Sequence, residues 1–329
     1  MIIDKSTSQV ADPGVPALIR WAPSALLVWA IGYGGLRIYW AAGNTPRFEP
    51  TGNDLVAFTG WGAVGLCLAA AGIAVAVRMT VGSRPLMVAG YALAAAMLVA
   101  DALLLLDVVS VLIPGLGADF GLVAAGSRVA LFVGAALVAA STVGYQRQAN
   151  DACPRCGRRA DHLPSRQTPR WAYVGAYAAV AGCLIRLLVQ FLAGFDTIPL
   201  DGGASLLIFE VGFLLAGTLL PLALVHSWGR IWPGWVPLLS GRSVPRWLVL
   251  GPGLVLSAGI TSYFGVTLAQ MVGNVLNGNP GFDDTGPLSQ AFFWVAVPSY
   301  CIWGLGMGVA AVAYFRTTRP GCRSCGRGA

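Results

Sequence analysis

The chain has 329 residues, of which 56% are hydrophobic and only 11% are charged. A soluble domain carries about a quarter charged residues, so this composition excludes an ordinary globular surface. The net charge of +7 would suggest a nucleic-acid partner in a soluble protein. Here the basic residues lie in short segments between long apolar runs, which predicts membrane orientation and no nucleic-acid partner.

Residues 1–19 precede the first apolar run and are predicted to form a cytoplasmic N-terminal segment. They contain Asp4 and Lys5 but no apolar stretch, so we do not expect a cleaved signal peptide. The run that follows Arg20 is longer than the apolar region of a signal peptide. It therefore predicts a retained membrane span.

Eight apolar runs are long enough to cross the hydrocarbon core as helices, which takes about 20 residues each. In chain order, the predicted spans are Trp21–Gly43, Asp54–Val77, Pro85–Val108, Phe120–Gly144, Trp171–Gly194, Ser205–Val225, Trp247–Gly273 and Leu288–Phe315. Glycine and proline occur inside several of them, which membrane bundles tolerate. The sequence predicts an all-α integral membrane protein with eight transmembrane helices.

The segments between these spans differ sharply in charge. If the segments are assigned alternately to two sides, seventeen arginine and lysine residues fall on one side and only Arg47 on the other. Cytoplasmic loops of membrane proteins carry the excess of basic residues. We therefore expect a multi-pass protein of the plasma membrane with both termini and the central loop in the cytoplasm.

The two halves of the chain end in the same motif. Tyr-x-Arg followed by Cys-x-x-Cys-Gly-Arg occurs at 145–158 and again at 314–327, a constant shift of 169 residues. Arg-Trp-Ala at 20–22 recurs at 170–172, and Arg37 has a counterpart in Arg186. This pattern predicts a duplication, with a first four-span repeat at 20–160, a cytoplasmic linker at 161–170 and a second repeat at 171–329. Both repeats would enter the membrane in the same sense, related by an axis along the membrane normal as in parallel-repeat transporters.

The first span also carries a family resemblance. Its segment Gly34–Gly43, Gly-Gly-Leu-Arg-Ile-Tyr-Trp-Ala-Ala-Gly, resembles the first span of uncharacterised multi-spanning membrane proteins of actinobacteria. The likeness is mainly confined to that span, because the second half has Leu-Leu-Val at 187–189 where the first has Ile-Tyr-Trp at 38–40. The resemblance implies that the protein comes from an actinobacterium, and it implies no particular activity.

Four of the seven cysteines form the two Cys-x-x-Cys-Gly turns, namely Cys153, Cys156, Cys322 and Cys325. Such a turn directs two sulfurs inward, and glycine follows where the backbone needs a positive φ. Two turns supply the four thiolates of a closed structural zinc site. The turns lie far apart in sequence, but a twofold relation between the repeats would bring them to one place on the cytoplasmic face.

Two other interpretations of these cysteines remain open. Cys-Pro-x-Cys turns also occur in oxidoreductases, which would make them redox dithiols. A structural disulfide is disfavoured by the reducing cytosol. The sequence favours structural zinc as the cofactor.

Five ionisable residues lie inside the predicted spans, all in the outer half of the membrane: Arg37, Asp101, Arg128, Arg186 and Glu210. Such residues usually face the bundle interior and pair with one another. One interpretation is that they neutralise each other, with Asp101 or Glu210 as the partner of Arg37. Another is a polar pocket in which Arg37 and Arg186 bind an anionic solute or headgroup. The third is that the arginines extend to the membrane interface.

No hydrolase, metalloprotease, P-loop or dinucleotide-binding motif occurs in the chain. We therefore favour a non-catalytic membrane protein that binds or transports an anionic or amphiphilic small molecule, or a lipid, between its repeats. The alternative is a zinc-clamped scaffold or regulator that docks a cytoplasmic protein. An intramembrane enzyme with Asp101 and Glu210 as acid and base is a third hypothesis, for which no geometry is indicated.

Overall fold

The computed structural model describes residues 17–46, 48, 58–112, 121–153, 155–158, 167–193, 204–237, 239–282, 289–319, 322 and 325. The helices are α1 (Ala17–Tyr39), α2 (Trp61–Met79), α3 (Arg84–Ala100), α4 (Leu104–Leu112), α5 (Leu122–Ala149), α6 (Arg170–Ala193), α7 (Ala204–Val225), α8 (Arg246–Leu276) and α9 (Gln290–Thr317), with a π-helical turn η1 (Trp40–Asn44) and a 3-10 turn η4 (Ser227–Gly229). Over these ranges, β pairing is limited to one isolated bridge between Ile231 and Ser243.

Seven of the helices are long and apolar enough to cross a membrane, and α3 with α4 adds an eighth if that bent pair is one span. The predicted all-α class is confirmed. The helix ends agree with the predicted spans within a few residues, except in the second. There α2 begins at Trp61, whereas the predicted span begins at Asp54, and 51–57 lie outside the described residues.

The third predicted span, Pro85–Val108, is not one continuous helix. The helix is interrupted by a turn at 101–103, and the axes of α3 and α4 are bent by 52° relative to each other. Asp101 closes α3, and its carbonyl accepts a hydrogen bond from the Leu104 amide that starts α4. The broken segment contains neither proline nor glycine, so the usual local signal for a kink is missing.

Local capping explains where two of the helices begin. The Ser83 side chain accepts a hydrogen bond from the Leu86 amide at the start of α3, and proline follows in the first turn. Ser289 accepts from the Phe292 amide at the start of α9 in the same way. A serine oxygen satisfies an amide that lacks a partner in the helix, which stabilises the helix end by about 1 kcal/mol.

The outward faces of the helices are apolar. Val28 and Ile31 on α1 are 72% and 74% exposed, and Leu192 on α6 is 75% exposed. Apolar side chains continue along the other long helices, for example Leu68, Val174 and Ile208. Exposed apolar surface on this scale is foreign to a soluble monomer and indicates helices that face lipid.

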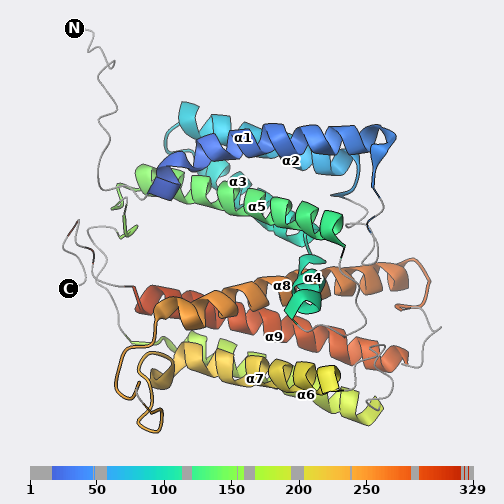
Figure 1. Ribbon diagram of the computed structural model, residues 1–329, viewed down its shortest axis with the longest axis vertical. Coiled ribbons are helices and arrows are strands. Elements are labelled where there is room, and N and C mark those ends of the chain that lie inside the picture. Colours follow the sequence, from blue (N-terminus) through green and yellow to red (C-terminus); the bar gives the residue numbers. More distant parts are fainter. Residues whose placement is uncertain are drawn as a thin grey trace.

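The long helices form two groups that lie side by side (Figure 1). In the first half, α1 packs against α2 and α5, and α5 packs against α3. In the second half, α6 packs against α7 and α9, and α9 packs against α8. Each half has its own core, centred on Leu26, Met97 and Val138 in the first and on Leu250, Trp303 and Met307 in the second.

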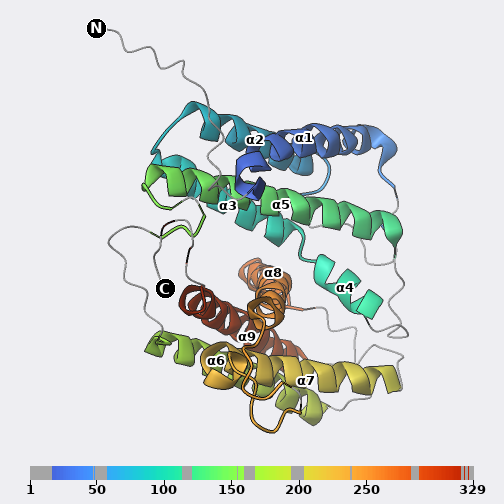
Figure 2. The ribbon, with the colours of Figure 1, turned by 60° about the vertical axis from the view of Figure 1, so that its left-hand side comes forward.

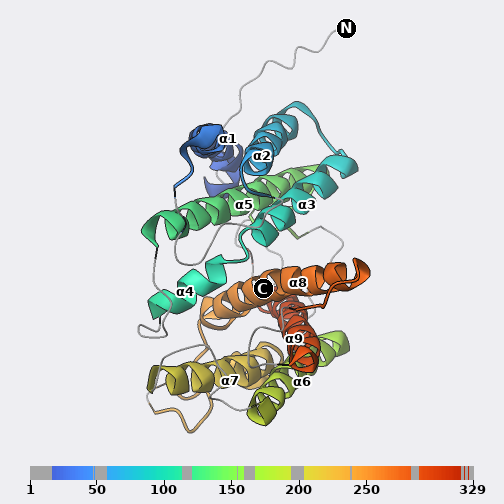
Figure 3. The same cartoon turned by 90° about the vertical axis from the view of Figure 1, so that its right-hand side faces the viewer.

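The short helix α4 joins the two halves. Figures 2 and 3 show it between α5 and α8, at the end of α3 that points away from Arg84. Its Leu105 side chain packs against the core of the second half and lies over Gly259 of α8, where a Cβ would approach Leu105 Cδ1 to 3.1 Å. The bend after α3 therefore gives the first half a direct apolar contact with the second.

Candidate metal centre and basic cleft

The last helix of each half delivers one cysteine pair to the same place. α5 ends at Ala149 shortly before Cys153, and α9 ends at Thr317 shortly before Cys322. The ends of α5 and α9 that precede the cysteines lie on the same side of the molecule (Figure 1). The four cysteines meet between them although the two pairs are separated by 169 residues.

The first cysteine loop closes on itself through its backbone. The Gly157 amide donates to the Cys153 carbonyl at 2.7 Å, and the Cys153 amide donates to the Arg158 carbonyl at 3.0 Å. Gly157 has a φ of +70°, a conformation that glycine adopts without the steric cost of a Cβ. The positive φ expected from the motif is therefore present in this turn.

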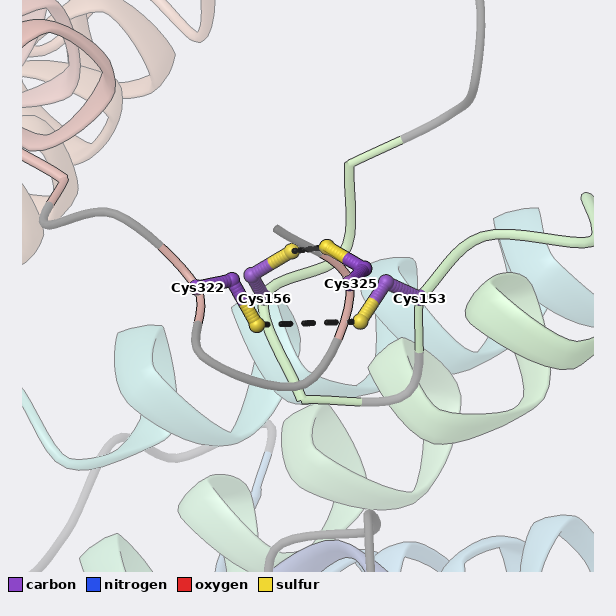
Figure 4. A group of neighbouring side chains, drawn as sticks. All are labelled: Cys153, Cys156, Cys322 and Cys325. Carbon is purple, nitrogen blue, oxygen red and sulfur yellow. Dashed lines mark hydrogen bonds between the residues drawn. The ribbon is translucent and has the colours of Figure 1, made fainter. Parts of the chain in front are cut away.

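Two of the sulfur–sulfur distances are close to those of a tetrahedral metal site. Cys153 Sγ lies 3.9 Å from Cys322 Sγ, and Cys156 Sγ lies 3.6 Å from Cys325 Sγ (Figure 4). All four sulfurs lie within 4.8 Å of one another. A zinc ion with Zn–S bonds of about 2.3 Å would place its sulfurs about 3.8 Å apart. The predicted proximity of the four cysteines is confirmed, and the group could bind a metal ion.

The thiols differ in how easily they lose a proton. Burial opposes ionisation of Cys153, but hydrogen bonds from the Cys156 and Arg155 amides outweigh it and lower the pKa of this thiol. Burial, together with the neighbouring cysteines, raises the pKa of Cys156 to about 12. A divalent metal favours the thiolate form of all its cysteine ligands, so this cluster suits a cation.

Two arginines tie the cysteine loops to each other. Arg158 donates from Nη2 to the Arg319 carbonyl at 3.0 Å, and Arg319 donates from Nη1 to the Cys156 carbonyl at 3.2 Å. Each bond runs from one half of the chain to the other. The loops are therefore joined by side-chain hydrogen bonds as well as by the cysteine cluster.

A cleft of about 970 Å³ lies beside the cysteine loops, between the two halves. Its walls come from α3, α5, the first cysteine loop, α6 and α9. Four arginines line it, and the described lining residues include no aspartate or glutamate. The arginines are Arg147, Arg158, Arg316 and Arg319.

The arginines of the cleft and the neighbouring Arg246 repel one another. The pKa of Arg319 is lowered, first by burial and then by repulsion from Arg147, Arg246 and Arg158. Repulsion of this kind disfavours a further positive charge and favours an anion. Sequence analysis did not single out this cleft, although the repeated Tyr-x-Arg motif contains two of its arginines.

Among the intramembrane charges, Arg186 and Glu210 form an ion pair inside the second half. Arg186 donates from Nη1 and Nη2 to the two carboxylate oxygens at 2.7 and 3.0 Å, and from Nε to the Tyr300 hydroxyl at 2.6 Å. The side chains are 8% and 11% exposed. Glu210, one of the two partners considered for Arg37, pairs with Arg186 on the adjacent helix.

Arg128 and Asp107 form a second ion pair, inside the first half. Arg128 Nη1 lies 2.8 Å from both carboxylate oxygens of Asp107, and both side chains are buried. Sequence analysis singled out Arg128 but did not recognise this pairing. The bend before α4 is what brings Asp107 to α5.

Arg37 lies in a polar cluster of the first half. It donates to the Tyr33 hydroxyl at 2.6 and 2.9 Å and to Ser127 Oγ at 3.0 Å. It also lines a cavity of about 360 Å³ next to η1. Asp101 is buried at the break between α3 and α4. Arg37 and Arg186 thus belong to polar clusters in different halves.

No protein-family model, curated protein or solved structure matches this chain.

Proposed function

We propose that this chain is a membrane protein that binds an anionic or amphiphilic molecule between two duplicated four-helix halves, which a structural zinc ion joins at the arginine-rich end. The observation that carries the proposal is the cysteine cluster, in which each half contributes two sulfurs to one group within 4.8 Å. A tetrathiolate zinc has no open coordination position, so we assign it a structural role and no hydrolytic one.

The packing of the two halves supports the duplication. The three main contacts in the first half are α1 with α2, α1 with α5 and α3 with α5, and their equivalents α6 with α7, α6 with α9 and α8 with α9 all occur. Tyr145 and Tyr314, at equivalent positions, both anchor the loop between the second and third helices of their half. Tyr145 accepts a hydrogen bond from the Ser83 amide, and Tyr314 donates one to the Gly229 carbonyl.

A pair of small side chains supports the same relation. In the first half, Gly34 of α1 lies against Cys67 of α2, where an added Cβ would come within 3.2 Å of Cys67 Cβ. In the second half the two residue types are exchanged, so that Cys183 of α6 lies against Gly217 of α7. One glycine and one cysteine keep the helices close in both halves.

The cleft supports an anionic ligand better than the intramembrane charges do. Arg128 and Arg186 each have a carboxylate partner within their own half. The cleft, in contrast, brings four arginines and several aromatic side chains together between the halves. The arginine asymmetry of the loops supports a cytoplasmic location for this end of the molecule. From the resemblance of the first span, we expect the membrane to be the plasma membrane of an actinobacterium.

Metal analysis of the purified protein tests the zinc centre. We expect about one zinc ion per chain, and loss of the metal in the Cys322→Ser, Cys325→Ser double variant, because two thiolates cannot complete the tetrahedron. Cys301→Ser is the control, because this cysteine lies inside α9, and it should retain the zinc. Full zinc content in the double variant would contradict the joint site. Zinc-free protein with disulfide-linked cysteines would favour the redox interpretation.

A further inference from the structure

Two arginines related by the duplication line the same cleft. Arg147 lies in the last turn of α5 and Arg316 in the last turn of α9. Each follows two residues after a buried tyrosine that is hydrogen-bonded to a neighbouring loop. The helix ends that carry the two cations are therefore fixed, and the cations face a shared space from opposite halves.

The helix lengths place this space at the depth of lipid headgroups. α5 and α9 have 28 residues each, which corresponds to about 42 Å at 1.5 Å per residue. The hydrocarbon core is only about 30 Å thick. The excess is expected at the ends that carry Arg147 and Arg316, because charged side chains are costly in the hydrocarbon, so these final turns would reach the layer of the lipid phosphates.

The remaining walls of the cleft suit an amphiphile. Trp171, in the first turn of α6, is 45% exposed, and Tyr91 of α3 is 39% exposed. Aromatic side chains of this kind concentrate at the boundary between hydrocarbon and water. Phe315 adds a further apolar surface next to Arg316. Cations and aromatic rings thus share one cavity.

We propose that this cleft binds the phosphate of an anionic phospholipid, held by Arg147 and Arg316, with the glycerol and upper acyl chains against Tyr91 and Trp171. The proposal rests on the proposed function above and names its ligand class. A guanidinium group forms two parallel hydrogen bonds to phosphate oxygens, which makes arginine the preferred partner of this anion. The volume of about 970 Å³ is sufficient for such a headgroup.

The metal centre holds one wall of the same cleft. Arg158 and Arg319 line the cleft and also make the bonds between the cysteine loops. Gly157 of the first loop packs so closely on Arg147 that a Cβ would lie 3.0 Å from its Nε. Loss of the metal would release both loops and the arginines that contact them. We therefore expect lipid affinity to depend on bound zinc.

Native mass spectrometry of the purified protein, titrated with phosphatidylglycerol or with phosphatidylcholine, tests the proposal. We expect wild-type protein to bind phosphatidylglycerol at least tenfold more tightly than phosphatidylcholine. The Arg147→Gln, Arg316→Gln double variant should lose about 100-fold in affinity for phosphatidylglycerol, or tenfold for each contact removed. Removal of zinc by a chelator should weaken binding by at least tenfold.

The matched control is Arg20→Gln, Arg84→Gln, which removes the same charge from exposed positions at the same end of the bundle, outside the cleft. Its affinity should equal that of wild type, and the zinc content of every variant is measured in parallel. Equal loss in both double variants, or none in either, would overturn the cleft while leaving the zinc centre to its own test. Equally tight binding of glycerol 3-phosphate would overturn the lipid assignment. Unchanged affinity after chelation would overturn the coupling to zinc.

Discussion

The ion pair between Arg186 and Glu210 allows a stability prediction with a defined magnitude. At an N–O distance of 2.7 Å, the attraction amounts to about 6 kcal/mol for an effective dielectric constant near 20. Removing two charges from water costs several kcal/mol each, so the intact pair contributes little net stability. Loss of one partner has a much larger effect, because the remaining charge stays buried without compensation.

We therefore expect Glu210→Gln to lower the free energy of unfolding by about 3 kcal/mol, at the lower end of the range for broken buried pairs because water and lipid relieve part of the cost in membranes. Arg186→Gln should have a similar effect, since it leaves the carboxylate buried. The double variant should be more stable than either single variant, with a coupling energy of about 2 kcal/mol or more.

Unfolding in mixed micelles with increasing denaturing detergent measures these differences, with Arg242→Gln as an exposed control that should change stability by less than about 0.5 kcal/mol. Additive effects of the two substitutions would refute the pairing. A loss below about 1 kcal/mol in Glu210→Gln would show that water reaches the pair and that the burial argument is wrong.

Two further predictions concern the loop after α7 and the orientation of the chain. Gly229→Ala should destabilise the protein by about 1–3 kcal/mol in the same assay, because its Cβ would lie 1.8 Å from the Ala223 carbonyl oxygen. Gly234→Ala, where the nearest atom is 4.0 Å away, should be neutral, and equal effects would contradict the steric explanation. In intact cells, a membrane-impermeant thiol reagent should label Asn277→Cys but not Ser165→Cys; the reverse pattern would invert the proposed topology.

The sequence was sufficient to predict the helices and the meeting of the cysteines, and the reasons are physical. A membrane span needs a long apolar run, so the local composition of a segment is enough to identify it. The meeting of the cysteines was predictable because Cys153 and Cys322 stand in the same repeated sequence motif, and a parallel duplication, as we propose, would bring both copies of it to one side. Neither inference requires the contacts of any particular side chain.

The break at Asp101 and the partners of the buried charges were not predictable in this way. The bend after α3 has no proline or glycine and depends on contacts of α4 with α5 and α8. The partner of Arg128 depends in turn on that bend. Three arginines lie at a predicted depth compatible with Glu210, and only the packing of α6 against α7 selects Arg186. The sequence did not predict the cleft, because its walls come from segments of both halves that lie far apart in the chain.

The helix α4 and the cysteine loops join the halves at opposite ends, and this has a mechanical consequence. At one end, each half supplies two sulfurs and an arginine to a shared network. At the other, Leu105 lies on Gly259 in a small apolar contact. The metal–sulfur bonds of the proposed zinc centre would hold the halves together more strongly than this apolar contact, and two rigid bodies joined in this way separate first at the weaker contact. If the two halves move apart, we therefore expect the contact of α4 with α8 to separate first, while the halves rotate about the cysteine cluster as a hinge.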